Sequence, residues 1–284
     1  MIHTGQRQLL CSCLLATACG LAGNPAYAEA TAPDLPIWQA LEYEQKALWV
    51  TAHSRVELVA DADDCQLWLL TAQSSVASNS EEVELELAAR DGRALQRARL
   101  SQGKGRRFKN YEFLPEYILR QRRDPPANTK LPPDEWPLTS SKEVAYPPLP
   151  DDTVVTDAYA LLELAGRFLA SEAASRQVAV NTEFNFYLVT MSRSDTPAIK
   201  VNYQVEGQAK AVSGQRDTRG VTLQVSPLGE QADKPDFSLL GLHGEISLLF
   251  DRDNGLPLQL KGTAPRLGST EINLVGVTLR DPGQ

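Results

Sequence analysis

The feature that most constrains this chain is a strict alternation of apolar and polar residues that recurs along it. Val83, Leu85 and Leu87 alternate with glutamates, and the same period of two returns at residues 199–206 and 221–225. This period places apolar side chains on one face of a β-strand and polar ones on the other. Such one-sided strands are typical of antiparallel sheets. We therefore predict a mainly β protein with a curved antiparallel sheet, or an open barrel or roll.

One segment has the period of an amphipathic helix instead. From residue 157 to 170, apolar residues follow the spacing i, i+3, i+4, i+7, and Glu163 is placed to pair with Arg167. Thr156 is the expected N-cap. We predict that this helix packs on the sheet. A weaker helical pattern covers residues 35–48.

The chain divides into a signal peptide and three further parts. Residues 29–123 form a β-rich half, and residues 153–284 hold the helix and a second antiparallel half. Between them, residues 124–152 are rich in proline, which cannot donate to a central strand. We expect an extended surface connection there, pinned to the body by Trp136 and Tyr146. Residues 29–284 are expected to form one structural unit.

The first 28 residues have the pattern of a cleavable export signal. Arg7 precedes an apolar run, and Ala26 and Ala28 supply the small side chains of a cleavage site before Glu29. We predict a periplasmic protein. The alternative is a lipoprotein processed at Cys19. After cleavage at Ala28, Cys65 is the only cysteine, so no intramolecular disulfide is expected.

No motif of catalysis, metal binding or nucleotide binding stands out. Only His53 and His243 remain after removal of the signal, and neither belongs to a ligand or triad pattern. The acidic run at Asp251–Gly255 does not have the spacing of an EF-hand, and its Asn-Gly pair predicts a hairpin turn instead. We predict no catalytic residue, metal or cofactor. The net charge of −8 argues against nucleic-acid binding.

Charge is strongly segregated along the chain. Residues 97–123 carry nine basic side chains against two acids, interleaved with four aromatic residues. Such a mixture suits an anionic ligand with an apolar portion. The predicted binding residues are Lys104, Arg106, Arg107, Lys109, Arg120, Arg122 and Arg123. The alternative is a solvated hairpin whose arginines neutralise the protein's own acids.

The second half resembles a bacterial family of exported proteins of unknown function, the DUF3108 type. The similarity lies in the segment Val155–Leu162, the strand, turn and Leu-Pro of Phe250–Leu258, and an expected closing strand at Gly268–Leu279. It covers roughly residues 150–280. The resemblance implies an exported, curved antiparallel β-fold, and it transfers no catalytic residue.

These observations favour a non-catalytic periplasmic protein that binds or handles an anionic or amphiphilic component of the cell envelope, such as a lipid or a polysaccharide. One alternative is an envelope saccharide hydrolase that uses a carboxylate pair. Another is a lipid-anchored partner of an envelope assembly. No transmembrane segment is expected in the mature chain.

Overall fold

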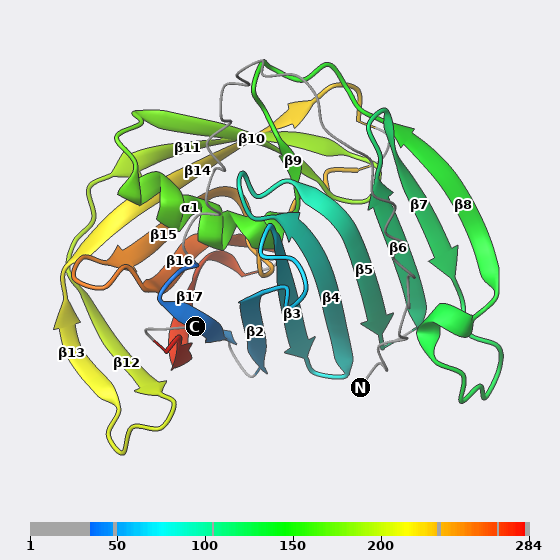
Figure 1. Cartoon of the computed structure of the whole chain (residues 1–284). Coiled ribbons are helices and arrows are strands. Elements are labelled where there is room, and N and C mark those ends of the chain that lie inside the picture. Colours follow the sequence, from blue (N-terminus) through cyan, green and yellow to red (C-terminus); the bar gives the residue numbers. More distant parts are fainter. Residues whose placement is uncertain (1–34, 48–49, 104, 232–233, 266, 282–284) are drawn as a thin grey trace, which may run out of the picture.

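The described part of the chain forms one large, curved β-sheet with a single short α-helix inside the curve (Figure 1). The computed structural model describes residues 35–47, 50–103, 105–231, 234–265 and 267–281. The proposed signal peptide, Cys19 and Lys104 lie outside the described residues. The sheet does not close into a barrel, because β8 and β9 end it on opposite sides. The predicted fold class is confirmed.

The first half is an antiparallel meander in which each strand pairs with the next. Its strands are β1 (Trp38–Ala47), β2 (Val50–Ala60), β3 (Leu67–Val76), β4 (Asn79–Ala88), β5 (Ala94–Gln102), β6 (Arg107–Phe113), β7 (Tyr117–Arg123) and β8 (Leu138–Ala145). β1 also pairs with β17, the last strand, so the sheet continues from one half into the other.

The second half runs outward from that junction in the order β17, β16, β15, β14, β11, β10 and β9. Its strands are β9 (Val155–Thr156), β10 (Ser175–Asn181), β11 (Phe186–Ser194), β12 (Ile199–Val205), β13 (Val212–Arg216), β14 (Thr218–Leu228), β15 (His243–Asp251), β16 (Pro257–Ala264) and β17 (Gly268–Leu279). The hairpin β12–β13 joins the end of β17. The β9–β10 and β12–β17 pairings are parallel, which makes the sheet mixed.

The alternation seen in the sequence produces the inner face of the sheet. Leu85 and Leu87 on β4 lie opposite Leu70 and Trp68 on β3, and all four are buried in one core cluster. The glutamates between them point to the outer face. Neighbouring strands therefore stack their apolar residues on the same side, as the sequence pattern predicted.

The helical pattern of residues 35–48 is wrong, because residues 38–47 form β1. The pairing of β1 with β17 shifts register at Trp38/Ala40 and at Glu42/Tyr43. These irregularities break the strict period of two, so apolar residues recur at a spacing that imitates a helix. Sheet pairing on both sides decides the conformation of this segment.

The predicted helix is present as a 3-10 turn, η2 (Ala158–Ala160), followed by α1 (Leu161–Ala170). The pair between Glu163 and Arg167 is confirmed. The N-cap prediction is wrong, since the Asp157 side chain accepts from the Tyr159 backbone N–H at 2.9 Å. Thr156 belongs to β9, and its hydroxyl instead donates to the Gly92 carbonyl at 2.7 Å.

Both halves of the sheet enclose α1. Leu164 packs against the β4–β5 turn, where a Cβ at Gly92 would lie only 2.6 Å from the leucine side chain. On its other side the helix contacts β11, β14 and β15. Arg193 on β11 donates to the carbonyls of Phe168 and Leu169 at the end of the helix. The helix therefore fills the concave side of the sheet.

The proline-rich connection is pinned to the body. Trp136 is fully buried, and its indole N–H donates to the Leu131 carbonyl at 2.9 Å. The Tyr146 hydroxyl donates to the Leu114 carbonyl at 2.9 Å. The predicted anchoring of the proline-rich connection by Trp136 and Tyr146 is confirmed. The connection also contains a short 3-10 turn, η1 (Pro133–Glu135), and the edge strand β8, which the proline content did not predict.

The turn between β15 and β16 is also confirmed. Gly255 has φ +74°, and Asp251 accepts from the backbone N–H of Asp253 at 2.8 Å. Within the described ranges, acidic, histidine and cysteine side chains form no cluster suited to a metal ion. The described helical segments include none with the length and hydropathy needed to cross a bilayer.

Candidate binding groove

Basic side chains line the inner face of the sheet from β5 to β8. Residues directly opposite one another on antiparallel strands share a face. One row of directly opposite residues crosses β4 to β8 and consists of Leu85, Arg97, Tyr111, Arg120 and Lys142. Because Leu85 is buried in the core, the whole row lies on the inner face. The adjacent rows complete a set of seven: Arg97, Arg99, Arg107, Lys109, Arg120, Arg122 and Lys142.

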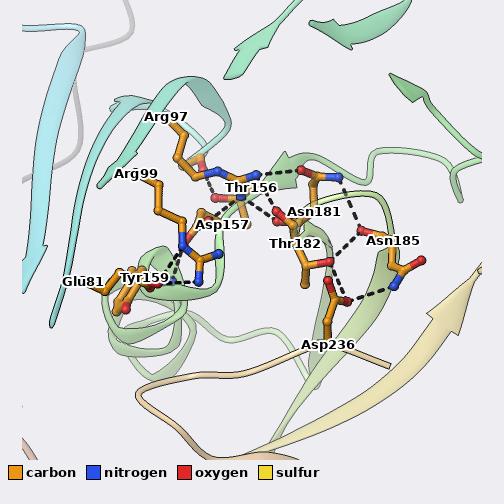
Figure 2. Close-up of polar contacts among 11 residues, drawn as sticks. Glu81, Arg97, Arg99, Thr156, Asp157, Tyr159, Asn181, Thr182, Asn185 and Asp236 are labelled. Carbon is orange, nitrogen blue, oxygen red and sulfur yellow. Dashed lines mark hydrogen bonds and ion pairs between the residues drawn. The ribbon is translucent and has the colours of Figure 1, made fainter. Parts of the chain in front are cut away.

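Arg97 is the most deeply placed of these cations, with 2% of its surface exposed. Its Nη1 donates to Asp157 Oδ2 at 2.7 Å and to the Asn181 carbonyl at 2.8 Å. Its Nη2 donates to Asn181 Oδ1 at 3.0 Å and to the Thr182 carbonyl. The guanidinium carbon lies 3.8 Å from the centroid of the Tyr111 ring. Arg97 therefore joins β5, the start of η2 and the β10–β11 turn (Figure 2).

Arg99 lies two residues further along β5 and, like Arg97, lines a cavity on the inner face of the sheet. Its Nε and Nη2 donate to Glu81 Oε2 at 2.8 and 2.5 Å, and about a third of its side chain is exposed. Tyr159 lies next to this pair (Figure 2). Burial, together with the negative charges of Glu81 and Asp157, raises the pKa of the Tyr159 hydroxyl. The groove thus holds a cation and a hydroxyl that stays protonated.

The groove itself is a cavity of about 440 Å³. Its walls are β2–β5 near the β3–β4 and β5–β6 connections, the start of η2, the β10–β11 turn and residues 236–241. Hydroxyl and amide side chains dominate the sheet side: Ser54, Ser74, Ser75, Asn79, Ser80, Ser101 and Gln102. A cavity of this size accommodates a small ligand or part of a polymer. The lining suits a polar, hydroxyl-bearing ligand.

Lys109 and Arg120 meet one carboxylate from the other half of the sheet. Glu183, in the β10–β11 turn, lies 2.5 Å from Lys109 Nζ and also accepts from Arg120. The Arg120 guanidinium lies over the Phe184 ring, 4.5 Å from its centroid, and Lys142 Nζ lies 5.1 Å from it. Burial alone would raise the pKa of Glu183, but the hydrogen bonds and charges of Lys109 and Arg120 hold that pKa below its usual value.

The structure separates the predicted binding residues into two groups. Arg107, Lys109, Arg120 and Arg122 belong to the inner face. Arg106 and Arg123 contact Trp136 elsewhere: the Arg106 guanidinium lies 4.7 Å from the Trp136 ring centroid, and Arg123 donates to the Trp136 carbonyl at 2.8 Å.

The sequence prediction omitted two groove residues, Arg97 and Arg99, which belong to the same basic segment. Their spacing of two repeats in Arg107 and Lys109 and in Arg120 and Arg122, which is the signal that places all six on one face. The serine-rich lining and Tyr159 come from separate elements and have no common sequence signal.

The carboxylates at the groove are already engaged by fixed donors. Glu81 accepts from Arg99, and Asp157 accepts from Arg97 and from the Tyr159 backbone. Asp236 accepts from the side chains of Thr182, Asn185 and Tyr187 at 2.8–3.0 Å. These acids organise the walls of the groove, and the arrangement favours binding over acid–base chemistry.

Comparison with known proteins adds no assignment. No protein-family model, curated protein sequence or solved structure matches this chain.

Proposed function

We propose that this chain is an exported periplasmic protein that binds an anionic component of the cell envelope in the inner-face groove, without catalysis. One observation carries the proposal. Seven described cations share the inner face, of which Arg97 and Arg99 line the groove and five lie beside it. Four carboxylates pair with these cations: Glu81, Asp124, Asp157 and Glu183. The excess of three positive charges contrasts with the chain's net charge of −8.

The polar lining narrows the class of ligand. Serine, asparagine and glutamine side chains can satisfy the hydroxyls of a sugar. Arg99 in the lining, and Arg107 opposite the lining residue Ser101, supply charge for sulfate, phosphate or carboxylate groups. An acidic or phosphorylated polysaccharide fits this combination. The export step rests on the signal pattern of residues 1–28, and the family resemblance of residues 150–280 stays a prediction.

Binding is tested with dextran sulfate as the anionic polysaccharide and unmodified dextran as its neutral counterpart. We expect wild type to bind dextran sulfate, with affinity falling as salt is raised, and to bind dextran at least tenfold more weakly. Arg99→Gln should weaken binding several-fold. The matched control is Arg55→Gln, which removes an arginine paired with Glu42 on the outer face of β2.

Two results would contradict the binding proposal. One is equal binding of dextran sulfate and dextran by wild type. The other is an equal effect of the Arg99 and Arg55 substitutions in variants that melt like wild type. Export is tested separately by mass spectrometry of the protein from its native host. A mature N-terminus at Glu29 supports periplasmic release, an acylated Cys19 supports the lipid-anchored alternative, and retention of residues 1–28 refutes export.

A further inference from the structure

A second surface lies at one end of the meander, beside the groove, whose lining includes Val76 and Asn79 from the same end. Because β3 to β8 alternate in direction, the β3–β4, β5–β6 and β7–β8 connections lie at the same end of the sheet, below β3–β8 in Figure 1. The first two connections touch: a Cβ at Gly103 would lie 2.1 Å from Asn79 Oδ1. We call these three connections and the adjoining strand ends the loop end.

Exposed apolar side chains occur at two places along the loop end, in the β7–β8 segment and, five strands away, at the end of β3. The described residues include five large apolar side chains that are strongly exposed, and three of them lie here. Leu131 and Leu138 in and after the β7–β8 connection are 46% and 48% exposed, and Val76 at the end of β3 is 43% exposed. Water is an unfavourable environment for them, so an apolar partner would gain from covering them.

The β7–β8 connection is built to hold these leucines outward. Trp136 is buried beneath it and bonds the Leu131 carbonyl, while Arg106 stacks on the indole and Arg123 bonds the Trp136 carbonyl. Five prolines between residues 125 and 137 restrict the backbone further. A fixed loop loses little conformational freedom when it binds, which favours a role in docking.

The charge at the loop end is positive. Arg106, Arg107 and Lys130 are exposed, and Arg122 and Arg123 lie at the end of β7. Among the described residues of the loop end, three acids oppose these five cations: Asp124, Asp134 and Glu135. Arg122 already pairs with Asp124 at 2.9 Å, so the outermost cations remain in excess. An acidic protein thus presents a basic end that also carries two of the three strongly exposed leucines among the described residues.

We propose that the loop end docks on an anionic lipid bilayer surface. Arg106 and Lys130 would meet the headgroups, and Leu131 and Leu138 would enter the interface between headgroups and acyl chains. A dissolved polyanion would use the charges but not the exposed leucines, and this combination selects a membrane. The two leucines and Lys130 do not belong to the groove lining, so they can be varied without altering the groove.

Vesicle flotation tests this proposal on the mature chain, residues 29–284. We expect wild type to bind vesicles of 70% phosphatidylcholine and 30% phosphatidylglycerol at least tenfold more strongly than pure phosphatidylcholine vesicles. Leu131→Ser with Leu138→Ser should lower that binding at least fivefold, and Lys130→Glu should lower it several-fold. The control is Leu267→Ser, which removes a 40% exposed leucine from the β16–β17 turn.

The results of these assays distinguish membrane docking by the loop end from ligand binding in the groove. If the leucine variant loses vesicle binding but keeps wild-type binding of dextran sulfate, the loop end is a membrane surface distinct from the groove. Equal binding to both vesicle types by wild type overturns the proposal, as does an equal loss in Leu267→Ser. If the leucine variant fails to fold, Lys130→Glu decides, because its exposed side chain has no role in the core; unchanged binding in that variant overturns the proposal.

Discussion

Arg97 is expected to carry a large part of the stability that joins the two halves of the sheet. Replacing it with Met keeps an unbranched apolar stem but removes the guanidinium group with its charge and its hydrogen-bond donors. Asp157 then stays buried without its partner, and two backbone carbonyls in the β10–β11 turn lose their donor. Breaking a buried ion pair from one side costs about 3–5 kcal/mol.

This loss is large relative to the total free energy of unfolding. Single domains unfold with about 5–15 kcal/mol, so Arg97→Met should remove a substantial fraction of the free energy of unfolding. At roughly 2–4 °C per kcal/mol for a chain of this size, the melting temperature should fall by about 6–20 °C. The matched control is Arg55→Met, which removes an exposed ion pair with Glu42 and should cost under about 1 kcal/mol.

The assay is urea unfolding followed by circular dichroism at pH 7. Asp157→Asn in the Arg97→Met background provides the sharper test, because asparagine keeps an oxygen for the Tyr159 N–H while removing the unpaired charge. We expect it to recover about 1–3 kcal/mol of the loss. If Arg97→Met costs no more than Arg55→Met, or if Asp157→Asn recovers nothing, the buried pair does not join the halves as argued.

Three further predictions concern the helix, the turn beneath it and the Glu183 pairs. Leu162→Asp should bury an unpaired charge on α1 and lower stability by several kcal/mol in urea unfolding; a wild-type midpoint would contradict the packing of the helix. Gly92→Ala should cost about 1–3 kcal/mol in the same assay, because φ is +78° and the new Cβ would meet Leu164 at 2.6 Å; a neutral effect would mean that the turn relaxes freely. Because the folded pKa of Glu183 is depressed, its pairing stabilises the protein above the ordinary glutamate pKa and is lost as pH falls through the folded value. Wild type should therefore lose more stability than Glu183→Gln between pH 7 and pH 3, and parallel losses would refute this role.

Local patterns predicted the elements wherever one physical rule acted alone. Val83, Leu85 and Leu87 alternate strictly because β4 has one buried face, and the helix at residues 161–170 has a continuous apolar side. The pattern failed at β1, where irregular pairing with β17 breaks the period. It also misplaced the N-cap, because the pairing of β9 with β10 holds Thr156 in a strand.

The sequence by itself determined a mainly β protein, one packed helix, an anchored proline-rich connection and a basic segment in an acidic chain. It could not decide what the basic segment faces. Arg106 and Arg107 are neighbours, yet Arg106 stacks on Trp136 while Arg107 belongs to the inner face, because β6 begins at Arg107 and Arg106 lies in the connection before it. The carboxylate that pairs with Lys109 and Arg120 comes from a turn 63 residues beyond Arg120. Only the curvature of the sheet brings that turn across the concave side, and so only the tertiary structure decides which cations are neutralised and which remain for a ligand.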